Sequence, residues 1–433
     1  MFLRLRRLLI CFVVFVAVAA VLIIKSSTFW SGDKAAGVPF GVHVFEGTDQ
    51  LVSQDFSMHL NFLREIWQQK VAHPYRLADQ EEMIRHWYPR IATGMPHAYS
   101  PVLLVAAAPF LALPPDWAYF GLSLLNALLL IVLTVWYLLP RIKNSVQAGA
   151  VFASFFSYVL LDVFLMGQTS IVTTCLLAAG VVLLETRSKR TGRERLLADL
   201  LLSLILYLLA IKPSVGLILV ALIIGERIWM ALLACGVGLL LTWVLLANHY
   251  GGLIAGLQDY LWILNHYCQA DMTSFLRPGL APGISTNFTS ALTIFAPEHN
   301  AAIFLASRLI FEGLIFALIV ARWFKRISFS TQLQGLLLTF LLFCPHLLVT
   351  EDFVICLLIV EGNFFRPGWS ALPKILLVFL LVNLILIGNL FTGPGSNPLP
   401  LAFAAKVILA SWWLLDLVRG SGRHEIDATI PAT

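Results

Sequence analysis

Long apolar runs separated by short polar turns make up most of this chain. A helix of about 20 apolar residues crosses the hydrocarbon core of a bilayer, which is roughly 30 Å thick. The pattern therefore predicts an all-α polytopic membrane protein. We place the apolar segments at 8–24, 101–113, 117–139, 149–165, 169–185, 197–211, 214–226, 229–247, 301–321, 331–349, 352–361, 374–391 and 399–418.

Two longer polar stretches interrupt these runs, at 25–98 and 248–300. Within the first, Phe56, Leu60, Leu63 and Trp67 follow a helical spacing of four, three and four. Such spacing predicts an amphipathic helix over 55–67 that lies in the membrane interface, where aromatic side chains sit at headgroup level. The polar face of this helix carries His59 and Arg64, and a second piece is expected from Gln80 to Trp87.

The net charge of +5 comes mainly from basic clusters between the apolar runs, which is the positive-inside pattern rather than a nucleic-acid surface. The strongest cluster, from Arg187 to Arg195, orients the chain with 25–98 outside.

The number of crossings follows from the same rule. An odd number of crossings would put Arg419 and Arg423 outside, so we expect about twelve crossings, with at least one apolar segment re-entrant or interfacial. Segment 8–24 is expected to be an uncleaved anchor, the alternative being a cleaved signal peptide.

The expected organisation is one integral membrane domain over 1–433. Six scattered cysteines show no metal or disulfide spacing, and no glycine-rich phosphate loop, HExxH or GxSxG motif is present, so we expect neither a metal nor a cofactor. The parts of the domain are a first span at 8–24, an external catalytic loop at 25–98, a helical module at 99–247, a second external loop at 248–300, C-terminal helices at 301–418 and a cytoplasmic tail at 419–433.

Asp55 and Lys212 are the first candidates for chemistry. A carboxylate at the membrane surface can act as a general base toward a sugar hydroxyl, the alternatives for Asp55 being a helix N-cap and a solvated loop charge. A lysine inside an apolar run is costly, by roughly 2.5–3.5 kcal/mol on insertion scales. Lys212 therefore either snorkels to the interface or holds an anion such as a lipid-linked phosphate. The break at Lys212-Pro213 predicts two half-helices, because proline cannot continue the hydrogen-bond ladder.

Two further polar breaks are candidate binding positions. Gly167-Gln168 is either a tight turn or part of a polar cavity that binds sugar or phosphate oxygens. Pro345-His346 ends an apolar run, where the histidine is either interfacial or stabilises a leaving group. Orientation by charge brings Asp55, Gln168, Lys212 and His346 toward one side of the membrane. Arg308 and Glu312 lie one turn apart, and we expect them to form a structural ion pair within a helix.

A set of short motifs, in this order, resembles glycosyltransferase family 87, a family of polytopic GT-C enzymes. The resemblance covers about residues 50 to 355. The matching residues are Asp55, Gly94-Met95-Pro96-His97-Ala98-Tyr99-Ser100-Pro101, Pro114-Pro115, Asn126, Gly167-Gln168, Lys212-Pro213 and Pro345-His346.

The resemblance implies a GT-C-like bundle and inverting transfer from a polyprenyl-phosphate sugar, commonly mannose, outside the cytoplasmic membrane, with Asp55 as the base. It departs at Ser170, where the family often has asparagine, and at Leu348, Thr350 and Glu351, where it often has His and Tyr-Asp. The expected partners are the lipid-linked donor, a glycolipid or glycan acceptor and the bilayer, with no nucleic acid. A flippase of lipid-linked sugars and a non-catalytic subunit of an envelope polysaccharide machine are the alternatives. The expected substrate-binding residues are Lys212, His346, Gln168, His59, Tyr99 and Arg64.

Overall fold

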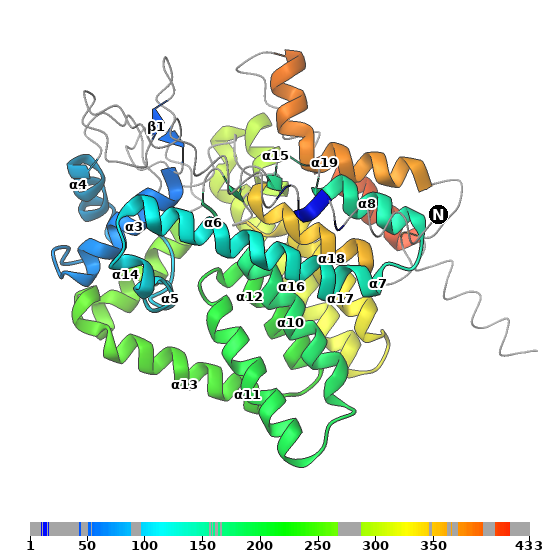
Figure 1. The fold of residues 1–433 in the computed structure, drawn as a ribbon, viewed down its shortest axis with the longest axis horizontal. Helices are drawn as coiled ribbons and strands as arrows, with labels where there is room; N and C mark the ends of the chain where they lie inside the picture. The colour runs from blue at the N-terminus through cyan, green and yellow to red at the C-terminus, as the bar shows by residue number, and fades with distance from the viewer. Residues whose placement is uncertain are drawn as a thin grey trace, which may run out of the picture.

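The computed structural model describes most of the chain, and the part that it describes is almost entirely helical (Figure 1). The described residues are 10, 12–14, 16, 43–44, 51–52, 54–87, 97–155, 157, 159–160, 163–164, 167–266, 287–345, 349–361, 365, 371–392 and 403–415. The elements are β1 (His43–Val44), β2 (Leu51–Val52), α3 (Gln54–Trp67), α4 (Leu77–Trp87), α5 (Val102–Leu111), α6 (Pro115–Val132), η2 (Leu133–Leu138), α7 (Leu139–Arg141), α8 (Ser145–Phe155), α10 (Ser170–Arg187), α11 (Gly192–Leu209), α12 (Pro213–Gly225), α13 (Trp229–Leu245), η3 (Ala247–Tyr250), α14 (Leu253–His266), α15 (Phe288–Phe295), η4 (Pro297–His299), α16 (Asn300–Trp323), α17 (Phe329–Phe343), η5 (Val349–Val354), α18 (Ile355–Val360), α19 (Ala371–Thr392) and an unlabelled helix Phe403–Leu415.

The only described strands, β1 and β2, pair antiparallel over two residues, His43 with Val52 and Val44 with Leu51. They add little to the fold.

Within the described ranges, three helices are long and apolar enough to cross a membrane: Trp117–Arg141, Ser170–Arg187 and Asn300–Trp323. The remaining apolar helices are shorter, at 10–17 residues. The prediction of a helical membrane protein is confirmed, and the number of crossings stays a prediction.

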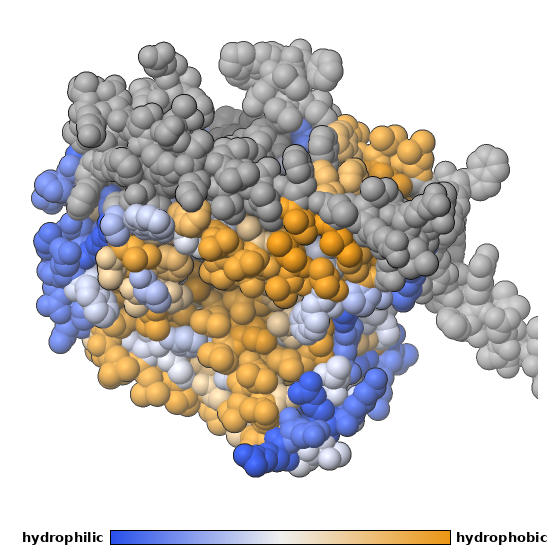
Figure 2. Space-filling model, viewed as in Figure 1, coloured by the Kyte–Doolittle hydropathy of each residue, from blue (hydrophilic) through white to orange (hydrophobic). Residues whose placement is uncertain are grey.

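The outer surface of the bundle is apolar where helices face away from the core. On α11, Leu196, Leu200 and Leu204 recur every four residues and each is more than half exposed. A wide orange band covers the face shown in Figure 2, and blue gathers over α3 and α4 and around the turn between α10 and α11. Such a band is what the lipid-facing surface of a membrane protein requires.

Helices α10, α11 and α12 form a continuous up-down-up unit. Arg187 at the end of α10 donates to Asp199 near the start of α11, at 2.6 Å, so these helices are antiparallel. Leu219, midway along α12, packs on Gly180, midway along α10, and Lys212 reaches Ser170 at the start of α10. Helix α12 therefore runs parallel to α10 and antiparallel to α11.

This arrangement corrects the prediction of two half-helices at Lys212-Pro213. The chain reverses direction there, because α11 ends at Leu209 and α12 begins at Pro213 with the fixed φ that suits a first helical position. The break is the turn of a helical hairpin. It places Lys212 at the N-terminal end of α12, where a helix also presents unpaired backbone amides.

The structure confirms the helices predicted at 55–67 and 80–87 as α3 and α4, with α4 beginning three residues earlier. Their position in the membrane interface stays a prediction. Their apolar faces close a second small core with α5 and α14 around Phe62, Ile66 and Tyr75. The stretch 248–300, predicted as a second external loop, contains the helices α14 and α15 in its described residues. Both helices escaped prediction because neither run was long enough to suggest a span.

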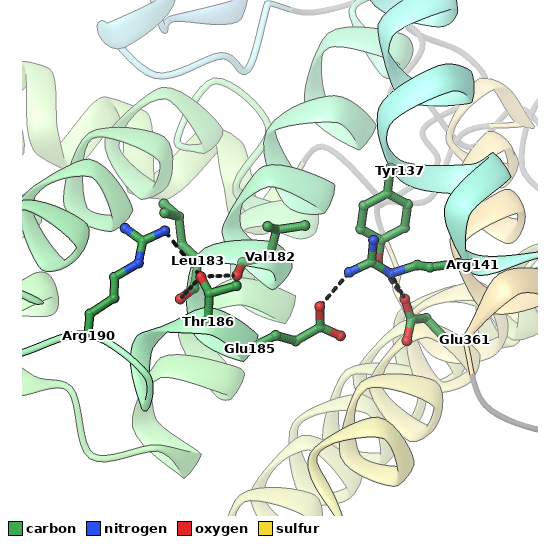
Figure 3. Close-up of polar contacts among 8 residues, drawn as sticks. All are labelled: Tyr137, Arg141, Val182, Leu183, Glu185, Thr186, Arg190 and Glu361. Carbon is green, nitrogen blue, oxygen red and sulfur yellow. Dashed lines mark hydrogen bonds and ion pairs between the residues drawn. The ribbon is translucent and has the colours of Figure 1, made fainter. Parts of the chain in front are cut away.

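The end of the bundle with the α10–α11 turn is closed by a polar cluster (Figure 3). Arg141 lies over the ring of Tyr137 and contacts the carboxylates of Glu185 and Glu361. Tyr137 also donates to Glu361 at 2.7 Å. The basic clusters at 141–143 and 187–195 therefore lie at one end of α10, and Lys212 with Gln168 lies at the other.

Candidate active site

Lys212 is the centre of the candidate site. Its side chain is only 4% exposed, and its ammonium lies 3.2 Å from Gln168 Oε1, 3.4 Å from Ser170 Oγ and 3.2 Å from Glu351 Oε1. Glu351, also 4% exposed, neutralises the charge. The structure thus brings Gln168 and Lys212 into direct contact, with a carboxylate that the sequence did not predict. The snorkelling alternative for Lys212 is excluded by this burial.

A second buried ion pair lies beside the first. Asp352 accepts from Lys406 Nζ at 2.6 Å, and both side chains are at most 1% exposed. Two adjacent acids of η5 thus bind lysines from two helices distant in sequence. The signal for Lys406 was present, because a lysine inside the apolar segment 399–418 is costly unless it is paired. Its partner could not be read from local spacing.

Gly167 brings helix α3 to this site. Its φ is +67°, and a Cβ there would lie 2.5 Å from the Cβ of Phe56 and 3.1 Å from the ring of Tyr119. Only glycine fits both the left-handed backbone and the close approach. Glycine before Gln168 therefore lets the first turn of α3 lie directly on the 167–170 turn.

Asp55 precedes Phe56 in that first turn. Helix α3 begins at Gln54, so Asp55 lies inside the helix rather than at its cap position. Its backbone is placed, and its side chain lies outside the described residues, as does all of His346. Both remain predictions of site residues.

His59, one turn after Phe56, is half-buried and forms a pair with the buried His97. The two Nδ1 atoms are 3.1 Å apart, so one ring donates to the other, and Nε2 of His97 has no hydrogen-bond partner in the described part of the chain. Burial, with a smaller contribution from the Lys212 charge, lowers the pKa of His59 to about 3. Burial also holds the pKa of His97 well below its usual value, aided by His59. Both rings are neutral at physiological pH and are suited to bind hydroxyl groups rather than to neutralise a phosphate.

Tyr99 contacts His59 edge to face, with ring centroids 4.7 Å apart. Its backbone carbonyl accepts from the Tyr75 hydroxyl at 2.8 Å, which fixes the segment before α5. Arg64 lies differently, since it donates to Leu111 O at 3.3 Å and to Leu113 O at the end of α5. There it satisfies carbonyls at a helix C-terminus. A role for Arg64 in substrate binding stays a prediction.

Two cavities adjoin beside Lys212, since Tyr99 and Ile211 line both, and Lys212 itself lines the larger one. The smaller, of about 130 Å³, lies between α3, α5 and α6; its wall is almost wholly apolar, with His59, Gln168 and Thr169 at its polar side. The larger, of about 350 Å³, lies between α12, α14 and α16 and is lined by Lys212 and Glu351 together with Asn265, Arg308 and Glu312. In the described residues no three His, Cys, Asp or Glu side chains form a group that could hold a metal ion.

The comparison with protein families identifies the class. The model of glycosyltransferase family 87 matches residues 97–350, and the chain belongs to this family. It is a membrane glycosyltransferase. The match includes Gln168, Lys212 and His346, and Asp55 precedes it. No curated protein and no solved structure matches the chain.

Proposed function

We propose that the protein transfers a hexose, such as mannose, from a polyprenyl-phosphate donor to a glycolipid or polysaccharide of the cell envelope. The observation that carries this proposal is the position of Lys212, a buried cation in the wall of the larger cavity and beside the smaller, almost wholly apolar one. A polyprenyl-phosphate sugar has the same two parts, a long apolar chain and an anionic head. The chain would enter the smaller cavity and the phosphate would lie near Lys212.

The reaction needs one base and one stabilised leaving group. Asp55 takes the proton of the acceptor hydroxyl, the hydroxyl oxygen attacks the anomeric carbon, and the bond to the phosphate oxygen breaks with its electron pair leaving on polyprenyl phosphate. In-line attack inverts the anomeric centre. Lys212 stabilises the charge that develops on the phosphate, and His346 is a second candidate for that role. Gln168 and His59 would bind sugar hydroxyls.

The topology that we propose follows from the two ends of the bundle. The basic turns lie at the end of α10 opposite Lys212, and lysine and arginine are enriched in cytoplasmic turns. We infer that the site faces the outside of the cytoplasmic membrane. About twelve crossings and a single domain with its catalytic loop at 25–98 fit this orientation.

Variants of Asp55 test the mechanism. The purified full-length protein is incubated with a panel of radiolabelled polyprenyl-phosphate sugars and a lipid extract of the cell envelope as the source of acceptor, and release of polyprenyl phosphate is measured. Asp55→Ala and Asp55→Asn should abolish release while leaving the protein inserted in the membrane. Asp79→Asn is the matched control, because Asp79 lies in the first turn of the neighbouring helix α4 and accepts from the backbone of His73.

Near-normal release by both Asp55 variants would reject the role of this residue as base. Movement of labelled lipid across a proteoliposome without release would instead identify a flippase. No release and no movement with the wild type, together with copurifying envelope proteins, would identify a non-catalytic subunit.

A further inference from the structure

Arg308 and Glu312 occupy an unusual place for a charged pair. They lie in α16, a candidate membrane span whose other outward residues are apolar, including Leu305, Leu309 and Phe316. Arg308 is the ninth residue of this helix, about 12 Å from its first residue. The pair is 45% and 55% exposed. A half-exposed charge at that depth is costly in lipid, and such residues face a cavity and mark a functional site by default.

The cavity that these residues face is the larger one, which also contains Lys212 and Glu351. Arg308 Nε donates to Glu312 Oε1 at 2.7 Å, and Arg308 Nη1 donates to Asn265 Oδ1 of α14 at 2.9 Å. An ion pair that were only structural would not need a third partner from another helix. The bond to Asn265 fixes the guanidinium plane at the cavity wall.

The remaining hydrogen-bonding groups of this triad are complementary. Within the described part of the chain, Arg308 Nη2 and Glu312 Oε2 have no partner. A donor and an acceptor thus lie side by side on a wall whose net charge is zero. Neighbouring hydroxyl groups of a sugar each donate and accept, and they match such a pair; an isolated phosphate would leave the carboxylate opposed by like charge.

We propose that Asn265, Arg308 and Glu312 form a sugar-binding subsite for the headgroup of the acceptor. This inference rests on the proposed function and assigns its acceptor side. The donor chain enters the smaller, apolar cavity, the acceptor headgroup occupies the larger cavity, and the two cavities adjoin at Tyr99 and Ile211, next to Lys212. The acceptor is then a glycoside whose hydroxyl-rich head enters from the outer half of the membrane between α14 and α16.

Photocrosslinking tests the subsite without any donor or turnover. Leu261 lies one turn before Asn265 on α14, lines the same cavity and is 51% exposed. It is replaced by p-benzoylphenylalanine in the full-length protein. Capture is measured with tritiated octyl α- and β-glycosides of mannose, glucose and galactose. At least one glycoside should be captured saturably, and the same photoprobe at Leu233 of α13, an exposed residue that does not line the cavity, should give no saturable capture.

Removing the pair should then weaken capture without changing the charge of the protein. Arg308→Gln with Glu312→Gln should raise the half-saturating glycoside concentration by at least about tenfold, because two hydrogen bonds to charged groups are lost. The matched control is Glu81→Gln with Arg85→Gln, which removes another Arg–Glu pair one turn apart, 2.8 Å, on α4. Asn265→Ala is the second variant, should the double variant fail to fold, and should weaken capture in the same direction.

Three results would overturn the subsite. The first is that the wild type captures no glycoside saturably, and the second is that the variants capture glycosides as well as the wild type. The third is that capture is reduced by added phosphatidylglycerol and is not reduced by unlabelled glycosides. The last result would mean that Arg308 binds an anionic lipid headgroup. Failure of the proposed function is detected in a separate assay, as the absence of polyprenyl phosphate release. Capture of a glycoside does not depend on that release.

Discussion

Lys212 and Glu351 form an ion pair of 3.2 Å in which each side chain is 4% exposed. The pair joins the start of α12 to η5. Because it is neutral, it is tolerated in the absence of substrate, and it offers a positive charge to a phosphate that approaches from the ammonium side. The contribution of the pair to stability can be separated from its function. Stability depends on both charges being paired, whereas binding of a phosphate depends on Lys212 alone.

Single substitutions in this pair should therefore be more damaging to stability than the double one. Lys212→Met leaves a buried carboxylate and Glu351→Gln leaves a buried ammonium, and each should cost about 3 kcal/mol of unfolding free energy. The double variant Lys212→Met, Glu351→Met should recover most of that loss and still bind no donor. The measurements are unfolding in detergent mixtures and binding of labelled polyprenyl-phosphate sugar.

The exposed pair of Lys70 and Glu65 provides the control. Its atoms are 3.7 Å apart and Lys70 is 59% exposed, so Lys70→Met should change stability by less than about 1 kcal/mol. Full recovery of donor binding in the double variant would show that Lys212 has no role beyond its pairing.

Gly167→Ala should impair activity through helix α3. The added Cβ meets Phe56 at 2.5 Å in a left-handed backbone, so the first turn of α3, which carries Asp55, must move away. A misplacement of about 1 Å can cost roughly a hundredfold in rate. We expect a loss of kcat of that order with a smaller change in KM.

Gly192→Ala is the matched control for this change. Gly192 also has a positive φ, +50°, but a Cβ added there would meet nothing within 4 Å. It should show the backbone cost alone, about 1 kcal/mol of stability, with activity preserved. Equal effects of the two substitutions on kcat would contradict the role of the Phe56 contact.

The His59–His97 pair should make stability depend on pH. In the unfolded chain a histidine has a pKa near 6.5, and burial lowers that of His59 to about 3. Below pH 6.5 the unfolded state therefore binds a proton that the folded state does not. The contribution is complete above about pH 6.5 and is lost as the pH falls toward 3, by about 1 kcal/mol per pH unit. In the His59→Asn variant, the free energy of unfolding measured at pH 6 and at pH 5 should therefore differ by about 1 kcal/mol less than in the wild type.

His299 is the control, because its side chain is 70% exposed. His299→Asn should leave the slope unchanged. A slope that His59→Asn does not alter would show that His59 is protonated in the folded protein, and would favour a role in binding phosphate.

The sequence predicted the helices of this fold well and their partners poorly. Spacing alone located α3, because its apolar face repeats with helical period, and charge placed Gln168 and Lys212 at one end. The hairpin at Lys212-Pro213 was missed because a proline indicates that a helix is interrupted, but does not indicate whether the chain continues in the same direction or reverses. Glu351 stood out only as a departure from the family pattern, since ion pairs between distant helices leave no local signal.

The predicted ion pair of Arg308 with Glu312 is confirmed. Sequence spacing could not show that Asn265 lies beside the pair or that the pair lines the same cavity as Lys212, because these neighbours come from helices distant in sequence.

Asn287→Ala should destabilise the segment that leads to His346. Asn287 is fully buried; its Oδ1 accepts from Ser290 N at 2.9 Å as the cap of α15, and its Nδ2 donates to Cys344 O at 2.7 Å. It formally begins the sequon Asn287-Phe288-Thr289, but its side chain is used inside the protein. The substitution removes a cap and a buried hydrogen bond, so we expect a loss of about 2–3 kcal/mol.

Ser328→Ala isolates the cap from the second bond. Ser328 caps α17 by accepting from Thr331 N at 3.1 Å on an exposed turn, so its loss should cost only about 1 kcal/mol and leave transfer unchanged. Unfolding in detergent measures both variants, and KM for the polyprenyl-phosphate donor reports the position of the 344–346 segment. Because that segment holds the candidate phosphate ligand His346, Asn287→Ala should also raise this KM, whereas an unchanged KM would restrict Asn287 to a structural role.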